Sequence, residues 1–353
     1  MSRPSRIALI SLAALLVAGL CLCLVWSARY RWWNEYRKGL DLSLSEAYES
    51  LGRPLPGNEA FLALSVLSSE RRWSEMEEYF DDSDKSILMS YYRNLHNAAC
   101  GSLSQHLMEF YQPFSLGLFL PVGDKSSKFE IISSGDVWFF LGDMTLAEHS
   151  TILGMIFSPG HSGKRFLKRL AEINLINGDD EAAMKYIRLL RKDPSTREWA
   201  AAHTPGRLSP EVSSWIDYKR SFVPVRDTLR SSGDVRASLL NLLDANPSNF
   251  AAREYLLCYD LLVKDLDSFY RDYDPGLSHA RVYDEAILIY LASHGLIGDE
   301  SVDYYGITQA VGQDFSDFTK AYSECGGKSA PLAQRFGKTY WFFYQFAIKN
   351  EKK

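Results

Sequence analysis

The chain has 353 residues, of which 46% are hydrophobic and 24% are charged, so it can form one large or two ordinary globular domains and is not a disordered, collagen-like or disulfide-scaffold protein. Lys and Arg total 39 against 44 Asp and Glu. This acidic balance argues against a general nucleic-acid-binding protein, and the five scattered cysteines indicate neither a disulfide framework nor a zinc ribbon.

The first predicted element is an apolar helix close to the N-terminus. Residues 7–26 carry no charge, and at about 1.5 Å per residue they would form a helix of roughly 30 Å, the thickness of the hydrocarbon core of a bilayer. We therefore expect a single, uncleaved transmembrane anchor within residues 1–28. The alternatives are a cleavable signal peptide, because Arg3 and Arg6 precede the run, and a lipoprotein signal, because Cys21 and Cys23 lie within it.

The orientation of this anchor is predicted from the charges beside it. Arg3 and Arg6 precede the span and four basic residues follow it by residue 38, so the positive-inside rule is nearly balanced, and the charge count alone slightly favours a cytoplasmic body. A very short tail before a first span is typical of an uncleaved export signal. On this ground we expect the body of the protein to be exported.

The body is predicted to be a helical domain at residues 58–347, after a juxtamembrane segment at 29–57 and before a charged tail at 348–353. Its apolar residues recur mostly at helical spacing, and only residues 129–132 are ambiguous with a strand. Turn signals divide the first part of the domain into helix pairs at 58–69 with 73–80 and at 86–99 with 103–111. Loops are expected at 112–128, crossing the surface, and at 203–210.

Two segments of this domain repeat the same order of residues, which is a Gly-Asp pair, then Ala, then Pro. The alanines of the two copies are 35 residues apart, and so are the prolines. Gly permits a tight turn, Ala lets two helices approach closely, and Pro ends the second helix. The pattern predicts two helix hairpins that stack side by side. The copies are Gly142-Asp143, Ala147 and Pro159, then Gly178-Asp179, Ala182 and Pro194, with shorter echoes at Gly233-Asp234 and Lys264-Asp265.

The second copy resembles a tetratricopeptide repeat (TPR) at Leu170-Ala171, Gly178-Asp179, Ala182, Tyr186 and Pro194, with one residue missing between Asp179 and Ala182. Residues from about 58 to 347 also resemble an uncharacterised Bacteroidetes family of membrane-associated, TPR-like proteins. The segments that carry this resemblance include GDVWFFLGDMTLAEH from Gly135, RLAEINLINGDDEAAMKYIRLL from Arg169 and GKTYWFFYQF from Gly337. The resemblance implies an all-α fold, an irregular TPR-like solenoid of helical hairpins, in a membrane-associated protein. Some relatives resemble multi-spanning proteins at their N-terminus, where this chain has one predicted span. With that span, we expect a single-pass protein of the bacterial inner membrane with a periplasmic body.

No motif for catalysis, nucleotide binding or metal binding is complete. The segment 160–164 has Lys164 where a nucleophile elbow needs glycine, and the segment 326–329 lacks the opening glycine of a phosphate-binding loop, since Tyr322 stands there. His96 and Cys100 could share a helix face, but no further paired ligands accompany them. We therefore expect a protein without enzymatic activity and without a cofactor or a metal.

The aromatic segment at residues 340–346 is predicted to be a buried helix that closes the array, with a partner or membrane contact as the alternative. In the TPR-like register, the first helix of each hairpin lines a concave face. Basic and aromatic side chains on that face would suit an acidic or C-terminal peptide, and a solvated face without a ligand is the alternative. The candidate groove residues are Asp136, Phe139 and Phe140 in one hairpin and Arg165, Lys168 and Glu172 in the next.

These features together predict a membrane-anchored, noncatalytic protein–protein interaction scaffold. Its partner is expected to be another protein or a peptide at the membrane and not a nucleic acid, and residues 7–26 are expected to contact the lipid bilayer. The alternative is an accessory or regulatory domain of an envelope transferase or transport system.

Overall fold

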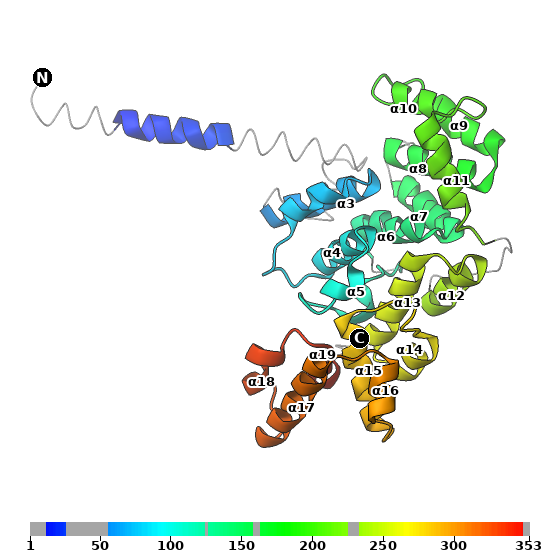
Figure 1. The fold of residues 1–353 in the computed structure, drawn as a ribbon. Helices are drawn as coiled ribbons and strands as arrows, with labels where there is room; N and C mark the ends of the chain where they lie inside the picture. The colour runs from blue at the N-terminus through cyan, green and yellow to red at the C-terminus, as the bar shows by residue number, and fades with distance from the viewer. Residues whose placement is uncertain (1–11, 26–55, 124–125, 158–162, 225–232, 349–353) are drawn as a thin grey trace, which may run out of the picture.

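The computed structural model describes residues 12–25, 56–123, 126–157, 163–224 and 233–348. Over these residues the protein is helical and contains no β-strand, which confirms the predicted all-α class. The ambiguous segment at 129–132 lies within a helix, because its apolar residues face a helical core and not a sheet. The helices stack in a curved arrangement from α10 at one end to α17 and α18 at the other (Figure 1).

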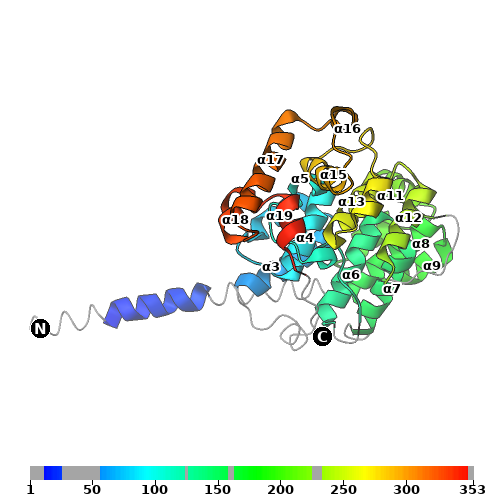
Figure 2. The ribbon, with the colours of Figure 1, turned by 90° about the horizontal axis from the view of Figure 1, so that it is seen from below.

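Residues 12–25 form a helix that stands clear of the other helices (Figures 1 and 2). Its large apolar side chains are exposed, among them Leu15 at 70% and Leu22 at 71%. In the described ranges, no helix combines the length and the apolar character needed to cross a bilayer. The predicted span at 7–26 extends at both ends beyond the described part of this segment, and the predicted juxtamembrane segment at 29–57 lies almost wholly outside the described residues.

The first part of the body contains the two predicted helix pairs. Ser86 begins the second pair as an N-cap, because its side chain accepts a hydrogen bond from the backbone N–H of Met89. The second member of the first pair is a 3₁₀ helix, and the second member of the second pair is an α-helix of only four residues. The elements are α3 (Pro56–Ser69), the 3₁₀ helix η1 (Trp73–Tyr79), α4 (Ile87–Ala99), α5 (Leu103–His106) and the 3₁₀ helix η2 (Phe114–Gly117).

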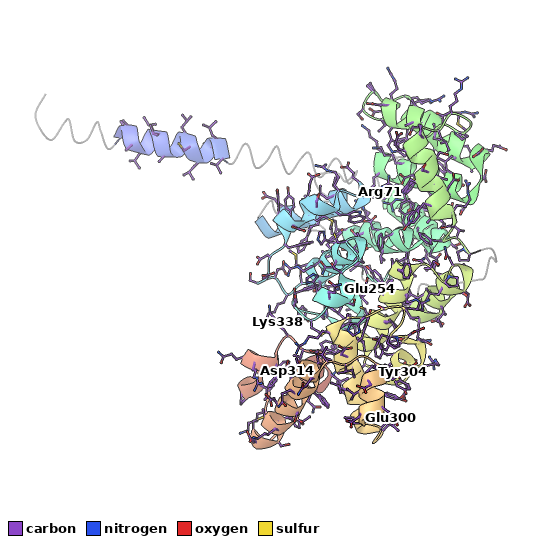
Figure 3. The ribbon with its side chains drawn as sticks, viewed as in Figure 1. Arg71, Glu254, Glu300, Tyr304, Asp314 and Lys338 are labelled. Carbon is purple, nitrogen blue, oxygen red and sulfur yellow. The ribbon has the colours of Figure 1, made fainter. Side chains whose placement is uncertain are left out.

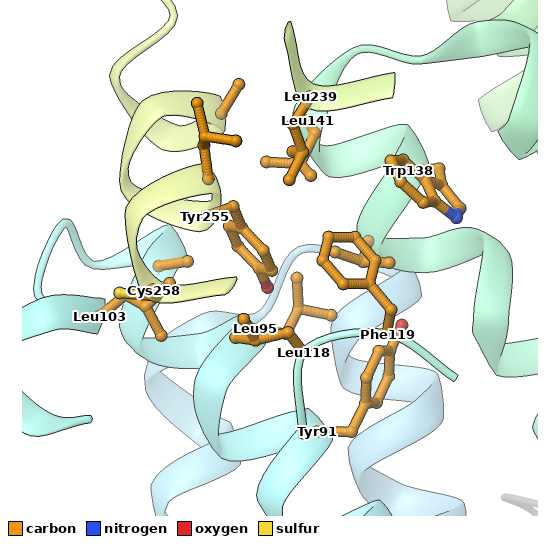
Figure 4. Packing of buried hydrophobic residues seen from close by; sticks show 14 of the residues in the cluster. Tyr91, Leu95, Leu103, Leu118, Phe119, Trp138, Leu141, Leu239, Tyr255 and Cys258 are labelled. Carbon is orange, nitrogen blue, oxygen red and sulfur yellow. The ribbon is translucent and has the colours of Figure 1, made fainter. Parts of the chain in front are cut away.

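The segment between α5 and α6 does not cross the surface as predicted. Leu118, Phe119 and Leu120 are all buried, and the ring of Phe119 stacks on Trp138 with centroids 4.7 Å apart (Figure 4). Phe119 also meets Tyr255 edge to face at 5.4 Å. The apolar run pulls this irregular backbone into the core, where it joins helices that are distant in sequence.

Two helix hairpins follow, and each turns at a glycine in the left-handed conformation. Gly142 has φ 102° and Gly178 has φ 81°, and the aspartate after each glycine caps the next helix. The two hairpins pack against each other through α7 and α8, so the predicted side-by-side stacking is confirmed. The elements of this part are α6 (Lys128–Leu141), α7 (Met144–Phe157), α8 (Lys164–Asn177), α9 (Asp180–Leu190), α10 (Arg197–Ala202) and α11 (Pro210–Arg220).

The register predicted for the second hairpin is wrong by one residue. Ala147 is the fourth residue after the cap Asp143, and the fourth residue after the cap Asp179 is Ala183. Both Ala147 and Ala183 are fully buried, whereas Ala182 is only half-buried. The cap fixes which face of the helix points inward, so the structurally equivalent alanines are 36 residues apart, like the two glycines. Pro159 lies outside the described residues.

A third hairpin turn of the same kind uses lysine in place of glycine. Lys264 has φ 63°, and Asp265 caps the next helix by accepting a hydrogen bond from Ser268 N at 3.0 Å. The Lys264 ammonium donates to the carbonyls of Tyr344 and Ala347, each at 2.7 Å. These charge-assisted bonds tie the turn to the last helix and offset the strain of the left-handed backbone.

The last helix is buried only in part. Tyr340 and Trp341 are almost completely buried, and the Tyr340 hydroxyl donates to the carbonyl of Leu261 at 2.9 Å, whereas residues 342–344 and 346 are half-buried. The helix packs on α15 and α18 and does not close the array as predicted, because α17 and α18 lie beyond it (Figure 1). The elements of the last part are α12 (Val235–Ala245), α13 (Phe250–Val263), α14 (Leu266–Asp272), α15 (Arg281–Ser293), α16 (Asp299–Tyr304), α17 (Gln309–Glu324), α18 (Ala330–Phe336) and α19 (Tyr340–Phe346).

Candidate ligand-binding site

Two adjoining pockets lie between the hairpins and the first part of the body. We call the first the aromatic pocket. It has a volume of about 360 Å³ and forms where the turn between α3 and η1 meets α6, α8, α11 and the start of α13. Its lining residues are Ser68, Arg71, Trp73, Asp136, Phe139, Phe140, Arg169, Trp215, Tyr218, Lys219, Phe222, Ser248, Asn249, Phe250 and Ala251.

We call the second the basic pocket, with a volume of about 410 Å³. Arg71 and Arg169 line both pockets, so the two hollows share a wall of two guanidinium groups. Figure 3 marks the place of Arg71, where the end of α3 meets α8. The lining residues are Ser69, Glu70, Arg71, Lys164, Arg165, Lys168, Arg169, Glu172, Ser195, Thr196 and Trp199.

The structure brings all six predicted groove residues to these two pockets. Three of them line the aromatic pocket and three line the basic pocket. Their exposure differs, because Asp136, Phe139 and Glu172 are buried, whereas Phe140 and Lys168 are half-buried. The buried members therefore form the walls, and the half-buried members are the ones that reach solvent.

The two buried acids are held by basic side chains. Asp136 on α6 forms ion pairs with Arg165 at 2.8 Å and Arg169 at 3.4 Å, both on α8. Ser68 on α3 donates a hydrogen bond of 3.1 Å to the same carboxylate. Buried ion pairs of this kind are stable only when both partners are present, because either charge alone would be costly to bury.

Glu172 connects the same network to the turn after α3. Its carboxylate lies 3.3 Å from Arg71 Nη1 and 3.8 Å from Arg169 Nε. Arg71 has φ 60°, the left-handed backbone conformation that costs an L-residue roughly 1 kcal/mol and suits glycine better. An arginine therefore occupies a position where the backbone alone would favour glycine.

The basic side chains outnumber the acidic ones around the two pockets. Six basic residues line them against three acidic residues, although the whole chain has a formal net charge of −5. This local excess favours an anionic ligand. The basic residues are Arg71, Lys164, Arg165, Lys168, Arg169 and Lys219, and the acidic residues are Glu70, Asp136 and Glu172.

Aromatic rings cover several of these cations. The guanidinium of Arg169 lies 3.7 Å from the ring centroid of Phe139, and that of Arg71 lies 4.0 Å from Trp215. Burial lowers the pKa of Arg169, and the nearby carboxylate of Asp136 partly offsets that effect. The rings stabilise the two cations in addition to their ion pairs with Asp136 and Glu172.

Lys219 on α11 is a buried lysine of the site, with 5% of its surface exposed. Its Nζ donates to the carbonyl of Phe140 at 2.6 Å, in the last turn of α6. Burial, and then the positive charges of Arg169 and Arg71, lower the pKa of this lysine from 10.5 to about 7. Its charge therefore changes close to neutral pH.

The basic pocket has an aromatic wall of its own. Trp199 on α10 stacks on His203 with centroids 3.7 Å apart, and Lys168 Nζ lies 5.6 Å from the Trp199 ring. Burial lowers the pKa of His203 below 6.5, while the carboxylate of Glu172 partly opposes the shift. Burial thus disfavours the charged form of this imidazole.

The comparison with known families covers nearly the whole chain. Residues 2–347 match a family of unknown function, DUF6057. The chain belongs to this family. No curated protein and no solved structure matches the chain. This match confirms the prediction that the chain belongs to an uncharacterised family.

Two residues of this DUF6057 protein were missed by the sequence reasoning. Lys219 lies at helical spacing among Trp215, Tyr218 and Phe222, so a lysine on an aromatic helix face was the signal that could have found it. Arg71 had no comparable signal. It follows the end of α3, and its contact with Glu172 joins residues 101 positions apart.

The residues considered for a metal lie elsewhere and are engaged with other groups. His96 Nε2 lies 3.8 Å from Cys100 Sγ and 3.5 Å from Glu77, and its Nδ1 lies 3.0 Å from the carbonyl of Trp73. Among the described residues, no group of three or more ligating side chains could hold a metal ion. Residues 160–162 of the incomplete nucleophile elbow lie outside the described residues.

Proposed function

We propose that this protein is a membrane-anchored, noncatalytic scaffold that binds an acidic segment of another protein. The binding surface is the groove that the basic pocket forms on an irregular, TPR-like array of hairpins. The observation that carries the proposal is the lining of this pocket, which has five basic and two acidic residues. Asp136, Glu172 and Asp193 pair with four of these cations, and Lys168 is the one for which the described residues show no ion pair. Electrostatic attraction of this kind raises the rate of association and selects acidic partners.

The repeated hairpin turn supports the TPR-like part of the proposal. Gly142, Gly178 and Lys264 take the left-handed conformation, and an aspartate caps the helix that follows each of them. Each turn is closed by the same backbone hydrogen bond, in which the N–H of the aspartate donates to the carbonyl five residues earlier. Examples are Asp143 N to Trp138 O and Asp179 N to Asn174 O. Stacked hairpins of this kind present a continuous surface to one extended partner.

The anchor part of the proposal is supported by the N-terminal segment. Residues 7–26 are uncharged, and the described helix at 12–25 exposes its apolar side chains. Such a surface is unfavourable in water and favourable in a bilayer. A reporter that is active only in the periplasm, fused after Lys353 of the full chain, tests the proposed orientation, and activity of a cytoplasmic reporter at that position would reverse it.

Site-specific photocrosslinking of the full chain in bacterial membranes tests the binding groove. A photoreactive phenylalanine replaces Ser195, which is exposed and lines the basic pocket. The matched control replaces Ser316, an exposed serine on α17 at the other end of the body (Figure 1). We expect a discrete protein adduct at position 195 that is absent at position 316.

Charge reversal then tests whether the basic side chains hold that partner. Lys168→Glu should remove most of the adduct, and Lys185→Glu, which reverses an exposed lysine on α9 outside both pockets, should leave it unchanged. The adduct should also weaken as ionic strength rises. An adduct that forms equally at both serines, or that survives Lys168→Glu, would refute the groove.

A further inference from the structure

The aromatic pocket has the size and enclosure of a small-molecule site. Its volume of about 360 Å³ falls in the range of roughly 300–1,000 Å³ that is usual for ligand pockets. Seven aromatic side chains line it, while Tyr218 and Phe250 are exposed at its rim. A ligand that entered here would stack against rings and lose most of its contact with water.

The charges inside this pocket are not balanced by the protein. Asp136 is the one acid among the lining residues, and its carboxylate already accepts from Ser68, Arg165 and Arg169. Glu172, which lines the basic pocket, forms ion pairs with Arg71 and Arg169. Three arginines and one lysine therefore face two carboxylates.

Of the three cations that line the aromatic pocket, Lys219 is the one without an acidic side chain of the described residues within ion-pair distance. Its hydrogen bond goes to the Phe140 carbonyl, and its other close neighbours are the rings of Phe139 and Phe222, at 5.6 and 5.8 Å. A buried ammonium has three N–H donors, so two remain for a ligand. The charged groups that face it are Arg71, Asp136, Arg169 and Glu172, from the other elements packed around α11.

The start of α13 adds to this positive field. Phe250 and Ala251 are the first two residues of α13 and both line the pocket. The N-terminal end of a helix of this length carries a partial positive charge. Together with Arg71, Arg169 and Lys219, it favours a negatively charged group inside an otherwise aromatic cavity.

We infer that the aromatic pocket binds a small organic anion, a carboxylate attached to an aromatic ring. The ring lies among the aromatic walls, and the carboxylate takes the positive charge of Arg71, Arg169 and Lys219 that the two buried acids leave unmatched. This ligand is separate from the acidic protein segment proposed for the basic pocket, so the two proposals can fail independently.

Calorimetric titration of the full chain in lipid nanodiscs, with empty nanodiscs as the blank, tests this inference. Three probes share one ring and differ in charge: indole-3-acetate, its neutral amide, and the cationic amine tryptamine. We expect the acid to bind at least about tenfold more tightly than the amide, and the amine not to bind. Equal affinity for acid and amide, or a Kd for the acid of about 1 mM or weaker, would overturn the inference.

Variants locate the bound acid. Lys219→Met should weaken binding at least about tenfold at pH 6.5, and it keeps most of the side-chain volume. Arg71→Gly should also weaken binding, and glycine suits the backbone there at φ 60°. Because this variant also removes one partner of Glu172, its far-UV circular dichroism and urea unfolding are measured beside the titration. Lys185→Met, at an exposed position on α9, is the control and should bind like the wild type.

The pH dependence provides a readout that a purely structural lysine would not move. Wild-type affinity for the acid should fall as pH rises from 6 to 8.5, because Lys219 loses its proton in this range. The affinity of Lys219→Met should stay flat over the same range. Parallel pH profiles for the two proteins would exclude the ammonium of Lys219 from the site.

Discussion

The buried amine of Lys219 leads to a prediction about stability that needs no ligand. Its pKa is about 7 in the folded protein and 10.5 when it is exposed to water. Between these two values the unfolded chain holds a proton that the folded chain has released, so the free energy of unfolding rises with pH. Below pH 7 both states are protonated and the whole cost of burying the charge is present.

The magnitude follows from the difference of about 3.5 between the two pKa values. Each pKa unit corresponds to about 1.4 kcal/mol, which gives an upper limit of about 5 kcal/mol between pH 7 and pH 10.5. In Lys219→Met this titration is absent. We expect the difference in unfolding free energy between wild type and variant to change by about 2–5 kcal/mol over this range, in favour of the wild type at high pH.

Urea unfolding of the full chain in neutral detergent micelles, followed by tryptophan fluorescence at several pH values, measures this difference. Buried tyrosines such as Tyr91 and Tyr255, whose pKa values burial raises, affect both proteins equally and cancel. Lys185→Met controls for the loss of a lysine that is exposed. A difference between wild type and Lys219→Met that stays constant from pH 7 to 10 would refute the reasoning.

Three further predictions concern the fold around the site, each measured as a change in unfolding free energy. Gly178→Ala should cost about 1 kcal/mol, because its φ of +81° disfavours a side chain although the space around it is open. Gly142→Ala should cost more, because its added Cβ would lie 2.6 Å from Phe222 Cβ. Equal costs for the two variants would contradict this close contact. Lys264→Met should cost about 2–3 kcal/mol and speed proteolysis after α19, since two charge-assisted bonds are lost, and unchanged proteolysis would exclude this tie. Asp136→Asn should cost about 3 kcal/mol, because Arg165 would lose its ion pair with Asp136 and Arg169 would keep only Glu172, and a neutral effect would show that these pairs are dispensable.

The parts of the fold that sequence reasoning predicted are those set by local chemistry. Gly142 and Gly178 supply left-handed turns, and the aspartates after them cap helices, so the two hairpins can be predicted from neighbouring residues. The same chemistry sets the register, because the cap Asp179 places Ala183 on the buried face of α9. The spacing between alanines and prolines points to Ala182, one residue away, because it does not take the cap into account.

The parts that were missed depend on residues far apart in the sequence. The burial of Phe119 requires Trp138 and Tyr255, and the position of Arg71 beside Glu172 requires the packing of α3 against the hairpins. The candidate groove was found only in outline for the same reason. Its six residues do meet at two pockets, but their division into buried walls and open rim depends on how α3, η1, α6, α8, α10, α11 and α13 pack together.

The shared wall gives the two proposed sites a physical connection. Arg71 and Arg169 line both pockets, and each has only a limited set of hydrogen-bond donors and one positive charge. A carboxylate in the aromatic pocket would draw on the same charge that attracts an acidic segment to the basic pocket. Because coupling between two sites is reciprocal, each ligand would weaken the other by the same factor, and the partner on the membrane would be released as the small anion accumulates.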